Sequence, residues 1–104
     1  MSDKRTAIEN TWAAECRYLA GLLETRGDQN VPPGAMRSYF AVQTASAKRH
    51  DMWALAATLE AIGAHVATDG TLTDGMRAND AAAVLRANAI ALDGNEYDDD
   101  EEGR

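Results

Sequence analysis

Apolar residues recur at steps of three and four positions through the first 26 residues of the chain, and this spacing is typical of one face of an α-helix. The residues of this stripe are Ile8, Trp12, Cys16, Leu19 and Leu23, with Leu22 at its edge. Gly27 follows where a left-handed residue ends a helix, and Ser2 or Asp3 can cap its start. The spacing therefore predicts an amphipathic helix over residues 3–26, which needs other helices to cover its apolar side.

Glycine and proline residues divide the following chain into further helical segments. The stretch GDQNVPPG ends the first helix, because paired prolines exclude helix before them and favour a helix start after them. A second helix is predicted over residues 33–49 and a third over residues 52–62, with Asp51 as the N-cap of the third and Gly63 at its end. Their expected core residues are Met36, Phe40, Ala47, Met52, Leu55, Leu59 and Ile62, with Tyr39 beside them.

The segment AHVATDGTLTDG has two interpretations. Asp69-Gly70 between two apolar residues can form a tight hairpin turn, but both flanks are short, and we favour a loop. A fourth helix is predicted over residues 74–92, with Thr73 as its N-cap. Its large apolar residues lie on two sides, with Met76, Val84 and Ile90 on one and Leu85 and Leu92 on the other. Such a helix needs two neighbours, either both within the chain or one of them in a dimer that shares this helix.

Negative charge is concentrated at the C-terminal end of the sequence. Residues 93–104 carry −6 of the net charge of −7, because they hold seven acidic residues against Arg104. A run of this kind repels itself and has little apolar area to bury, which is typical of disorder. We expect an all-α protein, with a compact bundle of about four helices over residues 1–92 and a disordered acidic tail over residues 93–104. The tail either binds a partner or only raises solubility.

The residue types that most often carry enzyme chemistry are sparse. Cys16, the single cysteine, falls in the apolar stripe and is expected to be a buried core thiol, which fits a reducing cytoplasm. His50 and His65 lack partners at metal-ligand spacing, and the run from Asp93 lacks the glycine and the glutamate of a calcium loop. The sequence has no Gly-Lys-Ser/Thr phosphate loop and no apolar run of the roughly 18 residues that a membrane span needs. We expect no catalytic residue, no cofactor and no metal site.

Two residues depart from the amphipathic pattern. Glu15 projects between Ile8 and Leu22, so it is expected to lie at the edge of the stripe or to bond to an Arg or Tyr of a neighbouring helix; the alternative is a general acid or base. Trp53 points away from the apolar stripe of the third helix, toward Glu60. It is either an exposed anchor for a partner or packed on a neighbouring helix.

These observations favour binding over catalysis, in one of two classes. The first is a non-enzymatic inhibitor or adaptor that binds a protein, with its acidic tail in a groove that normally holds nucleic acid. The second is a helical regulator or antitoxin-type module, either helix-turn-helix-like or a dimeric adaptor. The third helix has no Lys or Arg, and Arg37 with Lys48 gives only a small basic edge, so we expect no direct nucleic-acid binding.

The short helical body and the acidic run from Asp98 to Glu102 together resemble the small acidic proteins that phages encode against host defence, anti-CRISPR proteins among them. The resemblance implies a non-enzymatic blocker of a Cas protein or surveillance complex. Here the acids lie in a terminal segment rather than over a folded surface, which departs from a rigid DNA mimic. We expect a cytoplasmic monomer or homodimer with no membrane partner. The predicted partner-binding residues are Asp98, Asp99, Asp100, Glu101, Glu102 and Trp53.

Overall fold

The computed structural model describes residues 3–94, with side chains from residue 7 onward. Within this range the chain forms helices α1 (Asp3–Thr25), α2 (Met36–Arg49), α3 (Trp53–Gly63) and α4 (Ala78–Asp93), and a 3-10 turn, η1 (Pro33–Ala35), precedes α2. The prediction of an all-α bundle of about four helices is confirmed. Asp93, predicted as the first residue of the acidic tail, is instead the last residue of α4, and residues 95–104 of that segment lie outside the described residues.

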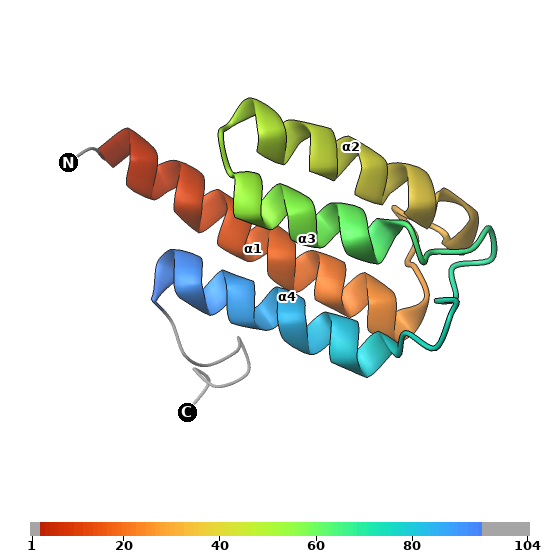
Figure 1. Cartoon of the computed structure of the whole chain (residues 1–104). Helices are drawn as coiled ribbons and strands as arrows, with labels where there is room; N and C mark the ends of the chain where they lie inside the picture. The colour runs from red at the N-terminus through yellow and green to blue at the C-terminus, as the bar shows by residue number, and fades with distance from the viewer. Residues whose placement is uncertain (1–2, 95–104) are drawn as a thin grey trace.

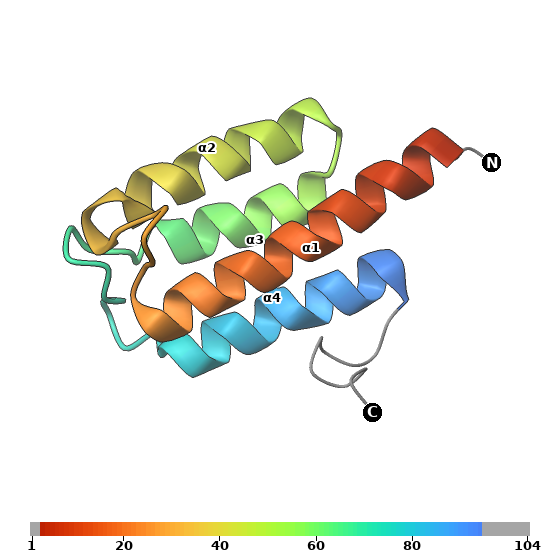
Figure 2. The same ribbon diagram turned by 180° about the vertical axis from the view of Figure 1, so that it is seen from behind.

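Each helix runs antiparallel to the one before it (Figure 1). The closest packing, however, joins α1 with α4 and α2 with α3. Figures 1 and 2 both show α1 in the middle, with α4 on one side and the α2–α3 pair on the other. The first and last helices of the chain are therefore direct neighbours. Helix α1 faces α4 on one side and the α2–α3 pair on the other.

Small residues allow α1 and α4 to approach closely. Alanines recur every seven residues on the facing sides of the two helices, and each is fully buried: Ala13, Ala20, Ala82 and Ala89. Residues seven apart lie on the same face of a helix, two turns from each other. A methyl side chain at these positions leaves little to separate the backbones, so the two helices pack along their length.

Two ion pairs join the same faces of α1 and α4. The Arg17 guanidinium donates hydrogen bonds of 2.7 and 3.3 Å to the Asp93 carboxylate, and the Arg86 guanidinium donates bonds of 2.7 and 2.9 Å to the Glu24 carboxylate. From residue 17 to 24 along α1, and from 93 to 86 along α4, the step is two turns in opposite directions. The two pairs fix the antiparallel register of these helices.

The predicted core is largely correct. Trp12, Cys16, Leu19 and Leu23 are buried together with every core residue that the sequence assigns to α2 and α3, while Ile8 is partly buried. In α4, Leu85 is fully buried, but Val84 keeps 46% of its surface exposed. The side of α4 that carries Val84 is thus not covered within the described chain.

The helix ends were predicted with mixed success. Gly27 has the positive φ that the sequence predicted, 98°, but Arg26 before it also has a positive φ of 60°, so α1 ends at Thr25, one residue earlier than predicted. The start of the fourth helix at residue 74 is wrong, because Asp74 and Gly75 both have positive φ, which an α-helix excludes, and α4 begins only at Ala78. Asp51 also has positive φ, and Met52 takes its place as the N-cap residue of α3.

The loop between α3 and α4 is closed by a single bridge between Val66 and Leu72. This arrangement is the loop that the sequence favoured over a hairpin, because one bridge does not extend into paired strands. The backbone N–H of Thr73 donates to the His65 carbonyl at 2.9 Å and ties the two ends of the loop together.

Candidate functional site

Trp53 is the first residue of α3 and keeps 60% of its surface exposed. The prediction that it points away from the core is confirmed, and its role as an anchor stays a prediction. An exposed tryptophan offers a large, rigid apolar surface, and this residue type is enriched in the energetic centres of protein interfaces. The other large apolar residues exposed among residues 7–94 are Val42 on α2 and Val84 on α4.

The outer face of α3 around Trp53 is nearly free of charge. Its exposed residues are Trp53, Ala54, Ala57, Glu60, Ala61 and Ala64. A solvated helix face usually carries charged or long polar side chains. Here Glu60 is the single charged group among these residues, and its carboxylate lies 3.7 Å from the Lys48 ammonium.

The outer face of α4 continues this surface. Its exposed residues are Asn79, Asp80, Ala83, Val84, Ala87 and Ala91, of which Asp80 alone is charged. A shallow groove of about 330 Å³ joins the two faces and is lined by Thr58, Ala61, Ile62, Met76, Asp80, Ala81 and Val84. We call the two outer faces and this groove the α3–α4 surface.

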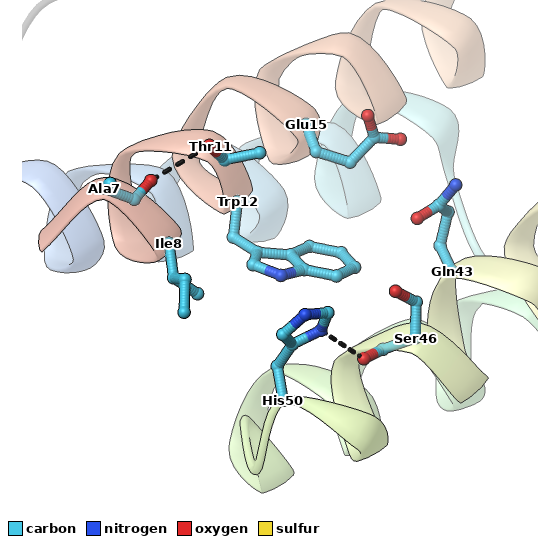
Figure 3. Close-up of a pocket in the computed structure, with 8 residues that line it drawn as sticks. All are labelled: Ala7, Ile8, Thr11, Trp12, Glu15, Gln43, Ser46 and His50. Atoms are coloured by element: carbon cyan, nitrogen blue, oxygen red, sulfur yellow. Dashed lines mark hydrogen bonds between the residues drawn. The ribbon is translucent and has the colours of Figure 1, made fainter. Parts of the chain in front are cut away.

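A second groove, of about 370 Å³, lies between α1 and α2 (Figure 3). The Trp12 ring lies between Glu15 and His50, and Gln43 and Ser46 form the wall on α2. The ring centroids of Trp12 and His50 are 6.4 Å apart in an edge-on arrangement, and the Nδ1 atom of His50 lies 2.9 Å from the Ser46 carbonyl. His50 follows α2 as its C-cap residue.

Glu15 forms its bond with the neighbouring helix beside this groove. The Tyr39 hydroxyl donates a hydrogen bond of 2.6 Å to the Glu15 carboxylate, which confirms the expected bond to an Arg or Tyr of another helix. Partial burial raises the pKa of the Glu15 carboxyl, and the bond from Tyr39 opposes this rise. The Tyr39 ring also meets Tyr18 edge-on, at a centroid distance of 6.1 Å.

Cys16, the next residue of α1 after Glu15, is fully buried in the core, as predicted. Burial, followed by the negative charge of Glu15, raises the pKa of the Cys16 thiol to about 12. A thiol becomes nucleophilic only as a thiolate, so Cys16 is inert at neutral pH.

The remaining predicted residues are spread over the molecule. Asp98, Asp99, Asp100, Glu101 and Glu102 lie outside the described residues. Arg37 and Lys48, the small basic edge predicted on the second helix, both line a separate hollow between α2 and α3. His65 stands in the α3–α4 loop, where its Nδ1 atom lies 3.0 Å from the Thr73 carbonyl.

The α1–α2 groove was not identified from the sequence, although the sequence contains a signal for it. Gln43, Ser46 and His50 recur at steps of three and four on α2, which places three polar side chains on one face of that helix. A polar face beside the stripe that contains Trp12 and Glu15 indicates an incompletely filled contact between the two helices.

Within residues 3–94, no helix is both long and apolar enough to cross a bilayer, and no cluster of three or more His, Cys, Asp or Glu residues could hold a metal ion. Comparison with known protein families, curated proteins and solved structures finds no match to this chain, so its function is inferred from its own residues and geometry.

Proposed function

We propose that this protein acts by binding a partner protein through the α3–α4 surface, with Trp53 as the main anchor. The observation that carries the proposal is the 60% exposure of Trp53 on a helix face otherwise made mainly of alanine. Burying such a face against a partner removes apolar area from water and desolvates few charges, so the balance favours association.

Alanine-rich faces also suit a helical partner. Short side chains let two helices approach closely, as they do inside this molecule between α1 and α4. The groove between α3 and α4 offers a place for larger side chains of the partner, and Val84 at its edge adds a second apolar contact.

The partner class that we propose is a protein of a nucleic-acid-processing complex, with a Cas protein or surveillance complex as the specific form, in the cytoplasm. Residues 95–104, which follow the Asp93 that is paired with Arg17, carry a net charge of −5 and would complement a basic groove of such a complex, raising the association rate at low salt. The body binds through apolar contacts and the acids steer the encounter, so the two contributions differ in their response to salt.

Affinity capture from host lysate, followed by binding measurements on the captured protein, tests this proposal. Trp53→Glu and Val84→Glu should each weaken binding at least tenfold, while Val42→Glu, at an equally exposed apolar residue on α2, should leave it unchanged. Equal effects of all three substitutions would show that the α3–α4 surface is not the interface.

The contribution of the acids is tested with a chain that ends at Gly94, since Asp93 belongs to α4 and must be kept. Binding by this shortened chain should be weaker at low salt and should approach that of the full chain as salt rises. A loss of binding that is the same at every salt concentration would contradict a steering role.

A further inference from the structure

We infer that the groove between α1 and α2 binds a small organic cation, an alkylammonium ion, with Glu15 as its counterion and Trp12 as the apolar platform beneath it. This site is separate from the α3–α4 surface, because its walls come from α1 and from α2 with its C-cap residue (Figure 3).

The first step of the argument is the charge balance at Glu15. One carboxylate oxygen accepts the bond from Tyr39, and no Lys, Arg or His among residues 7–94 forms an ion pair with Glu15. A half-buried carboxylate without a cation has lost part of its hydration and has regained only one hydrogen bond. A positive group bound at the other carboxylate oxygen would compensate the negative charge and the lost hydration.

The second step is the set of groups that surround this position. Trp12 lines the groove next to Glu15 with the 6% of its surface that stays exposed, and an indole ring attracts ammonium ions through its quadrupole. Gln43 and Ser46 face it from α2 with polar side chains that can accept hydrogen bonds, and an ammonium has three N–H donors to satisfy. Ile8 supplies an apolar wall at the other end, suited to an alkyl chain.

The third step excludes other ligand classes. Among the residues whose side chains the structure describes, Glu15 is the only carboxylate that lines the groove, so these residues do not supply the six or more oxygen ligands that calcium takes, and the negative charge of Glu15 repels anions. A volume of about 370 Å³ lies in the range of small-molecule pockets. The groove combines one carboxylate, one indole and neutral acceptors, with the His50 imidazole beside the indole, and this combination suits an amine.

The two tryptophans of the chain provide the readout. Trp12 lines the groove and Trp53 lies on the outer face of α3, so their indole N–H signals in NMR spectra report the site and a remote surface in one sample. Trp53→Phe assigns the two signals. Three probes of equal size, n-butylammonium, 1-butanol and butyrate, are titrated at pH 8 in phosphate buffer of constant ionic strength, since common amine buffers would compete.

The expected result is a saturable shift of the Trp12 signal by n-butylammonium, with a dissociation constant of about 1 mM or tighter and no matching change at Trp53. Glu15→Gln, which keeps an oxygen for Tyr39 but removes the charge, should weaken binding about tenfold or more. Glu60→Gln makes the same change of charge on the α3 surface and should have no effect. If Glu15→Gln proves unfolded by circular dichroism, Gln43→Leu removes an acceptor from the opposite wall and should weaken binding about threefold.

The inference is overturned if 1-butanol binds as tightly as n-butylammonium, because the groove would then be only an apolar hollow. It is also overturned if Glu60→Gln weakens binding as much as Glu15→Gln, or if the Trp12 signal does not approach saturation by about 20 mM ammonium.

Discussion

The guanidinium of Arg17 and the carboxylate of Asp93 form two hydrogen bonds although 76 positions separate the residues in the chain. Both side chains are largely withdrawn from water, with 17% and 9% of their surfaces exposed. The pair joins the middle of α1 to the last residue of α4. It therefore secures the end of the helix from which the acidic segment continues.

Asp93→Ala is expected to lower the free energy of unfolding by about 1–3 kcal/mol, because it leaves the partly buried Arg17 without this acceptor. Urea denaturation at pH 7 measures the change. Glu60→Ala is the control, because its partner Lys48 lies 3.7 Å away and both side chains are exposed; its cost should stay below about 0.5 kcal/mol. Equal losses in the two variants would show that the Arg17–Asp93 pair adds no more than a surface contact.

Three glycine-to-alanine substitutions are expected to differ in sign. At Gly27, with φ of 98°, an added Cβ would lie 2.7 Å from the Val31 carbonyl oxygen and 2.8 Å from the Pro33 nitrogen. These are backbone atoms that cannot move aside, so Gly27→Ala should cost more than about 2 kcal/mol. At Gly21, within α1, no atom outside the adjacent helix backbone lies within 4 Å of the added Cβ, and Gly21→Ala should stabilise the protein by about 0.5–1 kcal/mol.

Gly94→Ala should fall between these two, since Gly94 has φ of 77° but no nearby atoms. Its expected cost is about 1 kcal/mol, the cost of the left-handed conformation alone. Thermal unfolding of the three variants in one buffer orders them directly. A Gly27→Ala protein as stable as the parent would mean that the turn before η1 can rearrange at no cost.

Glu15 should make the protein less stable as pH rises. Burial raises the pKa of its carboxyl above 4.5 in the folded state, so folded chains bind this proton more tightly than unfolded chains. The stability from this site is fully present below pH 4.5 and is lost as pH rises through the higher folded value. Relative to the parent, Glu15→Gln should therefore gain stability over this window, by less than about 1 kcal/mol because the carboxylate is half exposed.

The comparison of these two proteins at each pH isolates Glu15 from Glu24, Asp28 and Asp69, whose lowered pKa values act in the opposite direction. Tyr39→Phe should raise the pKa of Glu15 further and steepen the loss, since it removes the bond that favours the ionised form. Urea denaturation between pH 4 and pH 8 measures both effects. A difference between Glu15→Gln and the parent that does not change with pH would contradict the raised pKa.

Cys16 should resist thiol reagents while the protein is folded. Its thiol is buried and has its pKa raised to about 12, so both access and thiolate are lacking at pH 8. The reaction with an aromatic disulfide reagent should be slower than that of the urea-unfolded chain by at least about a hundredfold, and its rate should follow the population of open molecules. Fast modification of the folded protein would mean that α1 separates locally from the core.

The parts of the fold that depend on nearby residues could be predicted from the sequence. The stripe from Trp12 to Leu23 and the left-handed Gly27 both follow from spacing within a few turns. The start of α4 could not be predicted, although Thr73 and Asp74 resemble a helix cap. Thr73 is instead bonded to His65, eight positions earlier on the other side of the α3–α4 loop, and this contact holds the chain in a turn.

The candidate sites likewise combine features that follow from nearby residues with features that depend on how separate helices are placed. The outward direction of Trp53 follows from its position relative to the stripe of α3, and the structure leaves it exposed. The pairing of Glu15 with Tyr39 requires the relative placement of α1 and α2, which no local pattern contains. Short connections predict that successive helices are neighbours, but the alanine faces and ion pairs make the first and last helices the closest partners.

The pairing of α1 with α4 sets an order for folding during synthesis. Only residues 50–52 connect α2 with α3, so these two helices can associate soon after they leave the ribosome. The alanine face of α1, in contrast, has no partner until α4 has been synthesised. When α1 and α4 then associate, they close a loop that contains α2 and α3. Joining such distant segments is slow, since the intervening chain must first be ordered. We expect the docking of α4 to limit the folding rate, and nascent chains lacking this helix to be those that chaperones retain.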